Sequence, residues 1–111
     1  MKQFELISAS GKTKTTAVID PRREALWAEA LGVESLDNLF DMTPADAAIP
    51  LLDAALARFH QDPESLRPHV DPEDATGLRM TRSGLLGLRK HLIQFGGVIS
   101  GVFEDVVSDT A

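Results

Sequence analysis

The sequence has no cysteine, no tyrosine, a single tryptophan and no long uninterrupted run of apolar residues. The lack of cysteine excludes a disulfide scaffold and thiolate chemistry, and it fits the cytoplasmic location that we expect. The longest apolar stretch is interrupted by Arg89, Lys90 and His91, so it does not form a simple membrane span. Because no long apolar run follows the first five residues, we expect no secretory signal peptide.

Recognisable catalytic and ligand-binding motifs are also missing. There is no Gly-x-Ser-x-Gly elbow, and His60, His69 and His91 lack the short spacing that puts metal ligands on one helical face. Gly11-Lys12-Thr13 matches only the end of a phosphate-binding loop, since that motif needs a glycine where Leu6 stands. We therefore expect a protein that is not an enzyme and binds no cofactor or metal ion.

What is present is the composition of an ordinary globular chain, with 43% apolar and 25% charged residues. A length of 111 residues suits one domain, 1–111, with a single core. The net charge of −6 is uneven: 1–23 carries +3, 24–75 carries −10 and 76–111 carries +1. An acidic chain repels phosphate backbones, so we expect no nucleic-acid or membrane partner and favour a basic protein. The alternative is that the acidic residues only keep exposed faces solvated.

The N-terminal segment predicts a β-hairpin. Phe4–Ala9 and Thr13–Ile19 are rich in β-branched and aromatic residues, and Ser10-Gly11-Lys12 between them suits a tight turn. Two strands alone are marginally stable in water, so the hairpin must pack on helices and gain a third strand, for which Thr76–Met80 is the candidate. If no internal strand fills that place, the open edge becomes a docking site.

The middle of the chain predicts helices with clear starting signals. Asp20-Pro21 and Thr43-Pro44 each combine a capping side chain with a proline at the helix start. Trp27 in the first of these helices is expected to anchor the core. The second helix should run to Gln61. Because Pro50 lacks the backbone amide, this helix should kink or begin afresh near Ile49. The fold class is therefore α+β, with a bundle of three to five helices.

The C-terminal segment Thr81–Val107 has apolar residues that return every three or four positions, the period of a helix with one buried face. These residues are Leu85, Leu88, Leu92, Phe95, Ile99, Val102 and Val106. We expect a long C-terminal helix that is capped by Thr81 and that kinks or breaks at Gly96-Gly97. If it breaks, Val98–Phe103 becomes a short strand or a second helix.

Two runs resemble small acidic bacterial proteins of the immunity type. The runs are LLDAALARFHQDPESLR at 51–67 and, after a loop, SGLLGLR at 83–89. In that family, a helix that ends in an Asp-Pro turn and a polar loop precede a leucine-rich helix. The resemblance implies an acidic protein that occludes the active site of a secreted toxin.

The first functional hypothesis is therefore a binding module with an acidic surface that docks on a basic protein, such as a cationic toxin. The candidate partner-binding residues are Glu29, Asp37, Asp41, Asp46 and Asp53.

The second hypothesis is a self-associating structural or accessory subunit without catalytic activity. Gly97 and Gly101 stand four residues apart and would form a flat strip on the C-terminal helix. Two copies of this helix could then pack closely as a homodimer about a two-fold axis.

Overall fold

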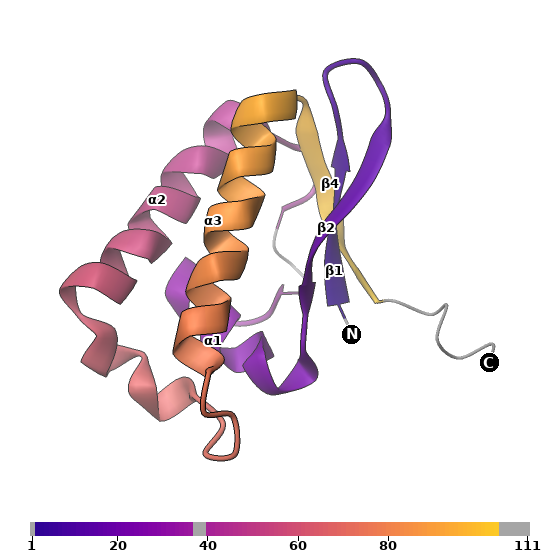
Figure 1. Ribbon diagram of the computed structural model, residues 1–111. Helices are drawn as coiled ribbons and strands as arrows, with labels where there is room; N and C mark the ends of the chain where they lie inside the picture. Colours follow the sequence, from indigo (N-terminus) through magenta and orange to yellow (C-terminus); the bar gives the residue numbers. More distant parts are fainter. Residues whose placement is uncertain (1, 37–39, 105–111) are drawn as a thin grey trace, which may run out of the picture.

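In the computed structural model, which describes residues 2–36 and 40–104, an antiparallel four-stranded sheet packs against three α-helices (Figure 1). The strands are β1 (Lys2–Ile7), β2 (Thr13–Ile19), β3 (Thr43–Pro44) and β4 (Val98–Glu104), in the order β2-β1-β4-β3. The helices are α1 (Glu24–Leu31), α2 (Ala45–Gln61) and α3 (Gly77–Phe95), with short 3-10 turns η1 (Pro21–Arg23), η3 (Pro63–Ser65) and η4 (Arg67–His69). The α+β class, with an N-terminal hairpin on a helical layer, is confirmed.

The predicted hairpin is present. The amide of Ser8 donates to the carbonyl of Lys12 (2.8 Å), and the amide of Gly11 donates to the carbonyl of Ser8 (2.8 Å). Gly11 has φ +87°, a conformation that favours glycine. In β1, Phe4 and Leu6 are buried, as expected for a strand with one face on the core.

The third strand is β4 and not residues 76–80, which contain the start of α3. β4 pairs antiparallel with β1 from Lys2 opposite Glu104 to Ile7 opposite Val98. This pairing joins opposite ends of the described chain, and no local sequence pattern predicts it. β2 is left as one edge of the sheet and the two-residue β3 as the other.

The expected helix from Thr81 to Val107 starts at the wrong residue, whereas the expected break at Gly96-Gly97 is confirmed. Val106 of the predicted stripe lies outside the described residues. The helix begins at Gly77, so Thr81 lies inside the helix with its side chain fully buried and does not cap it. It ends at Phe95, because Gly96 (φ +62°) and Gly97 (φ +80°) turn the backbone out of the helical conformation. Of the alternatives for Val98–Phe103, the strand is correct.

Gly97 permits a close approach of two backbones, although not between helices. A β-carbon there would collide with the carbonyl oxygen of Ile7. The amide of Ala45 donates to the carbonyl of Gly97 (2.9 Å), and the amide of Ala9 donates to that of Phe95 (3.0 Å). This corner therefore joins the end of α3 to the hairpin and to the start of α2, and Gly101 lies in β4 instead of on a helical strip.

The helices bury their apolar faces against the sheet and against one another. Leu85, Leu88 and Leu92 of α3 are fully or almost fully buried. Trp27 of α1 is 2% exposed, and its ring packs over Gly84, so its expected role in the core is confirmed. Because α2 is one helix from Ala45 to Gln61 with Pro50 inside it, the expected fresh start near Ile49 is wrong. Within the described ranges, no helix combines the length and apolarity needed to cross a bilayer.

Candidate docking surfaces

The predicted acidic residues do not form one free surface. Glu29, at the end of α1, is held by Arg58 of α2, whose Nη1 donates to the Glu29 carbonyl and whose Nη2 donates to its Oε1 (3.2 Å). His69 Nε2 lies 3.7 Å from Glu29 Oε2. Glu29 therefore connects α1 to α2 and to η4.

Asp53 also has a partner within the chain. Its Oδ1 accepts a hydrogen bond from Nε of Arg89, which joins the middle of α2 to α3. Asp41 and Asp46 are exposed, before and within the first turn of α2. Asp37 lies outside the described residues. The structure thus places two predicted acidic residues at helix–helix contacts and two at an exposed corner.

Helix α3 has the opposite charge to the chain as a whole. From Gly77 to Phe95 it contains three arginines and one lysine and no acidic residue. Arg79, Arg82 and Lys90 are exposed, and none of them forms an ion pair with another described residue. The fourth cation, Arg89, forms an ion pair with Asp53. This helix is a basic face on an acidic protein.

The contact between Asp53 and Arg89 defines a line along which α2 and α3 run side by side in opposite directions (Figure 1). Steps of three or four residues along each helix stay on the same face. Such steps place Leu56 level with Leu86, and Ile49 level with Ile93. One more step places His60 level with Arg82. We call these eight residues the α2–α3 seam: Ile49, Asp53, Leu56, His60, Arg82, Leu86, Arg89 and Ile93.

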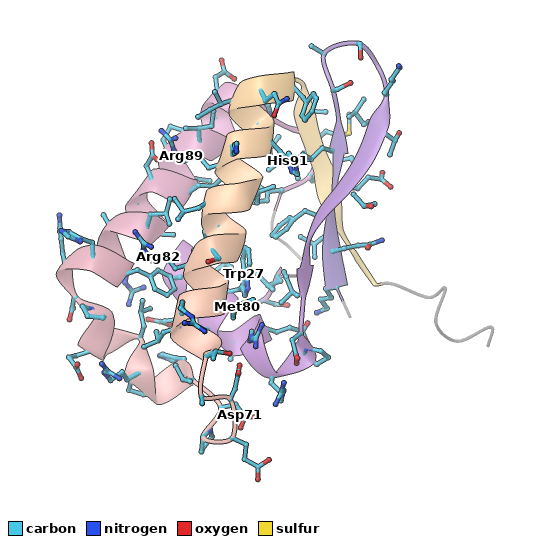
Figure 2. All side chains as sticks on the ribbon, in the orientation of Figure 1. Trp27, Asp71, Met80, Arg82, Arg89 and His91 are labelled. Carbon is cyan, nitrogen blue, oxygen red and sulfur yellow. The ribbon has the colours of Figure 1, made fainter. Side chains whose placement is uncertain are left out.

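The seam has an apolar component that reaches solvent. Leu86 is 41% exposed and Ile93 57% exposed, whereas the neighbouring Leu92 is 1% exposed. Figure 2 shows Arg82 and Arg89 on the side of α3 that faces α2, and His91 on the side that faces the sheet. The seam therefore combines exposed aliphatic side chains with a cation that has no partner among the described residues, which is the chemistry of a docking surface.

This basic face is hidden when the charge of the sequence is averaged over long blocks. The block 76–111 carries only +1, since Glu104, Asp105 and Asp109 offset four cations that all lie between Arg79 and Lys90. Counting charge only over the part of the predicted helix before Gly96-Gly97 gives three cations and no acidic residue, which reveals the basic face.

The glycines of α3 do not form an exposed strip for self-association. Gly84 faces the ring of Trp27, and a β-carbon at Gly84 would lie 2.5 Å from Cζ2 of that ring. A β-carbon at Gly87 would have no heavy atom within 4 Å. Of the three glycines in α3, Gly87 alone has open space at this position. A homodimer through glycines would thus have one open position on this helix.

A buried ion pair fixes the loop before α3 to the start of α1. Arg23 Nε donates to Asp74 Oδ2 (2.7 Å) and Nη2 to Oδ1 (3.1 Å), with the Asp74 side chain 4% exposed. These hydrogen bonds lower the pKa of Asp74 below its ordinary value and raise that of Arg23. Nearby, hydrogen bonds from Arg22 lower the pKa of Asp20 to about 2. These contacts are a structural clamp.

A hollow of about 310 Å³ lies beside this clamp. It is lined by Arg67, Val70, Asp71, Pro72, Asp74, Ala75 and Leu78. Arg67 is paired with Glu64 (2.7 Å) and Asp74 with Arg23, so these charged groups are already engaged. A second hollow, of about 250 Å³, contains the ion pair between Lys2 and Glu24 (2.8 Å). Glu34 and Ser35 also line the second hollow.

The described residues do not have the geometry of a metal site or of a phosphate-binding loop. Among residues 2–36 and 40–104, no three histidine or acidic side chains are grouped as metal ligands. Thr13 begins strand β2, whereas a phosphate-binding loop needs a helix at that point.

Comparisons with known proteins found no matching family model, no matching curated protein and no matching solved structure. The resemblance of residues 51–89 to immunity-type proteins therefore stays a prediction.

Proposed function

We propose that this protein is a non-catalytic protein-binding module that docks a partner on the α2–α3 seam. The observation that supports the proposal most strongly is the pair of exposed aliphatic side chains, Leu86 and Ile93, on a helix whose opposite face is buried. Covering them on binding contributes about 25 cal/mol for each Å² of apolar surface removed from water. Arg82 beside them would orient the bound partner and increase its rate of association.

Affinity capture at low salt from the cells that produce the protein tests this proposal. The tagged wild-type chain should retain a partner that the double variant Leu86→Ser/Ile93→Ser loses. Met80 supplies a matched control, because it is 45% exposed and lies elsewhere on the surface of α3. Met80→Ser should retain the partner. Equal capture by all three proteins would contradict a role for the seam.

A second candidate function is the binding of a cationic protein, such as a toxin, at the exposed corner formed by Asp41 and Asp46. It is favoured by the exposure of both carboxylates and by the net charge of −6. The same capture experiment separates it from the first. If this corner is the binding site, Asp41→Asn/Asp46→Asn should lose the partner and the seam variant should keep it.

Self-association as a structural subunit is tested separately. Light scattering after gel filtration at tens of micromolar gives the mass directly, and a strict monomer would remove the homodimer from consideration.

A further inference from the structure

The seam has a chemistry that selects among partners. Resting on the proposed function, we infer that it binds an acidic amphipathic helix of another protein. The exposed face of α3 offers cations and aliphatic groups, and no acidic residue lies between Gly77 and Phe95. A complementary segment must therefore carry carboxylates and aliphatic side chains together.

The spacing on α3 specifies the shape of that segment. Leu86 and Ile93 are seven residues apart, which is two turns or about 10.5 Å along the helix. Arg82 and Lys90 stand four residues before and after Leu86, and Arg79 stands one further turn before Arg82. A helix that lies along α3 can meet this pattern with aliphatic residues two turns apart and carboxylates beside them.

A second copy of the chain fits this face poorly. A two-fold axis across the seam would place α3 beside its own copy. Each α3 carries four cations and no acidic residue, so the two helices would repel. A two-fold axis along the seam would place α3 over α2 of the copy, whose only acidic seam residue, Asp53, is already paired with Arg89.

Nucleic acids and anionic membranes are also disfavoured. Both are dense arrays of negative charge, and the protein carries a net charge of −6. Asp53 stands within the seam itself, although it is paired with Arg89. A short acidic helix carries far fewer negative charges than a nucleic acid or an anionic membrane, and it can lie on the α3 side of the seam beside Arg79, Arg82 and Lys90.

A titration of the ¹⁵N-labelled full chain with synthetic peptides tests the inference. The probe is a helical peptide of about 18 residues, or about 27 Å, built from alanine, leucines two turns apart and glutamates beside them. The control peptide replaces every glutamate by lysine. The glutamate peptide should shift the backbone amide resonances of the seam and bind at least about tenfold more tightly than the lysine peptide. Raising NaCl from about 50 to about 500 mM should weaken the binding of the glutamate peptide.

Charge-reversed protein provides the matched variant. Arg79→Glu/Arg82→Glu/Lys90→Glu changes only exposed side chains without ion-pair partners among the described residues, and circular dichroism checks that it folds. The peptide preference of this variant should be reversed, so that it binds the lysine peptide more tightly than the glutamate peptide.

Three results would overturn the inference. The first is the absence of seam shifts with glutamate peptide up to about 1 mM, and the second is equal binding of both peptides. The third is seam shifts caused by a DNA oligonucleotide or by phosphatidylserine vesicles, but not by the glutamate peptide. If any of these occurs while seam-dependent capture from cells persists, the proposed function stands and only the partner chemistry is wrong.

Discussion

Substitution of Gly84 by alanine should destabilise the protein, although alanine is the better helix former. The gain in helix propensity is about 1 kcal/mol. Against it, the new β-carbon would lie 2.5 Å from Cζ2 and 3.1 Å from Cη2 of Trp27. That ring is 2% exposed and lies 5.5 Å from the ring of Phe4 between centroids, so it has little room to move. Overpacking of this kind costs about 1–3 kcal/mol.

Gly87→Ala is the control, because it lies three residues further along the same helix and its β-carbon would meet no heavy atom within 4 Å. It should stabilise the protein by up to about 1 kcal/mol. The propensity gains cancel in the comparison, which leaves Gly84→Ala less stable than Gly87→Ala by about 1–3 kcal/mol.

Urea unfolding followed by far-UV circular dichroism and by the fluorescence of the single tryptophan measures both variants. In a Trp27→Phe background, which removes the colliding part of the ring, Gly84→Ala should cost less, and circular dichroism alone reports the result. If Gly84→Ala proves as stable as Gly87→Ala, the packing of α1 on α3 described above is wrong.

Three further predictions concern stability. The pKa of Asp74 is lowered, so the contribution of its carboxylate to folding stability is present above pH 3.8, the ordinary pKa of the group, and is lost as the pH falls below that value. The stability of Asp74→Asn should therefore depend less on pH in the acid range than the stability of the wild type. Gly97→Ala should prevent folding or destabilise by several kcal/mol, because its β-carbon meets the backbone of β1 at a positive φ, and circular dichroism would show this; a stable Gly97→Ala protein would contradict the described corner. Leu92→Asp should cost about 3 kcal/mol or more, whereas Ile93→Asp should change the unfolding free energy by less than about 1 kcal/mol; similar losses would mean that the buried face of α3 is misplaced.

Local signals in the sequence were enough to predict part of the fold. The turn at Gly11, the proline-marked starts near Pro21 and Pro44, and the buried stripe of α3 all depend on neighbours within a few residues. The third strand could not be located in this way, because β4 finds its partner β1 at the other end of the chain. Apolar residues after Gly97 happen to continue the helical spacing, so the period alone placed them in the wrong element.

The candidate site was less predictable than the fold. Arg58 holds Glu29 from 29 residues away, and Arg89 holds Asp53 from 36 residues away, so sequence alone could not tell which carboxylates remain free. The seam itself requires two helices to lie side by side, a relation that only the tertiary structure supplies.

Photo-crosslinking inside the cells that produce the protein tests the docking surface most directly. p-Benzoylphenylalanine is placed at Ile93 in the seam and, as a control, at the exposed Thr15 of β2. The proposal predicts a discrete covalent adduct with another protein from position 93 and none from position 15. Irradiation that produces no adduct at Ile93, or the same adducts at both positions, would contradict it.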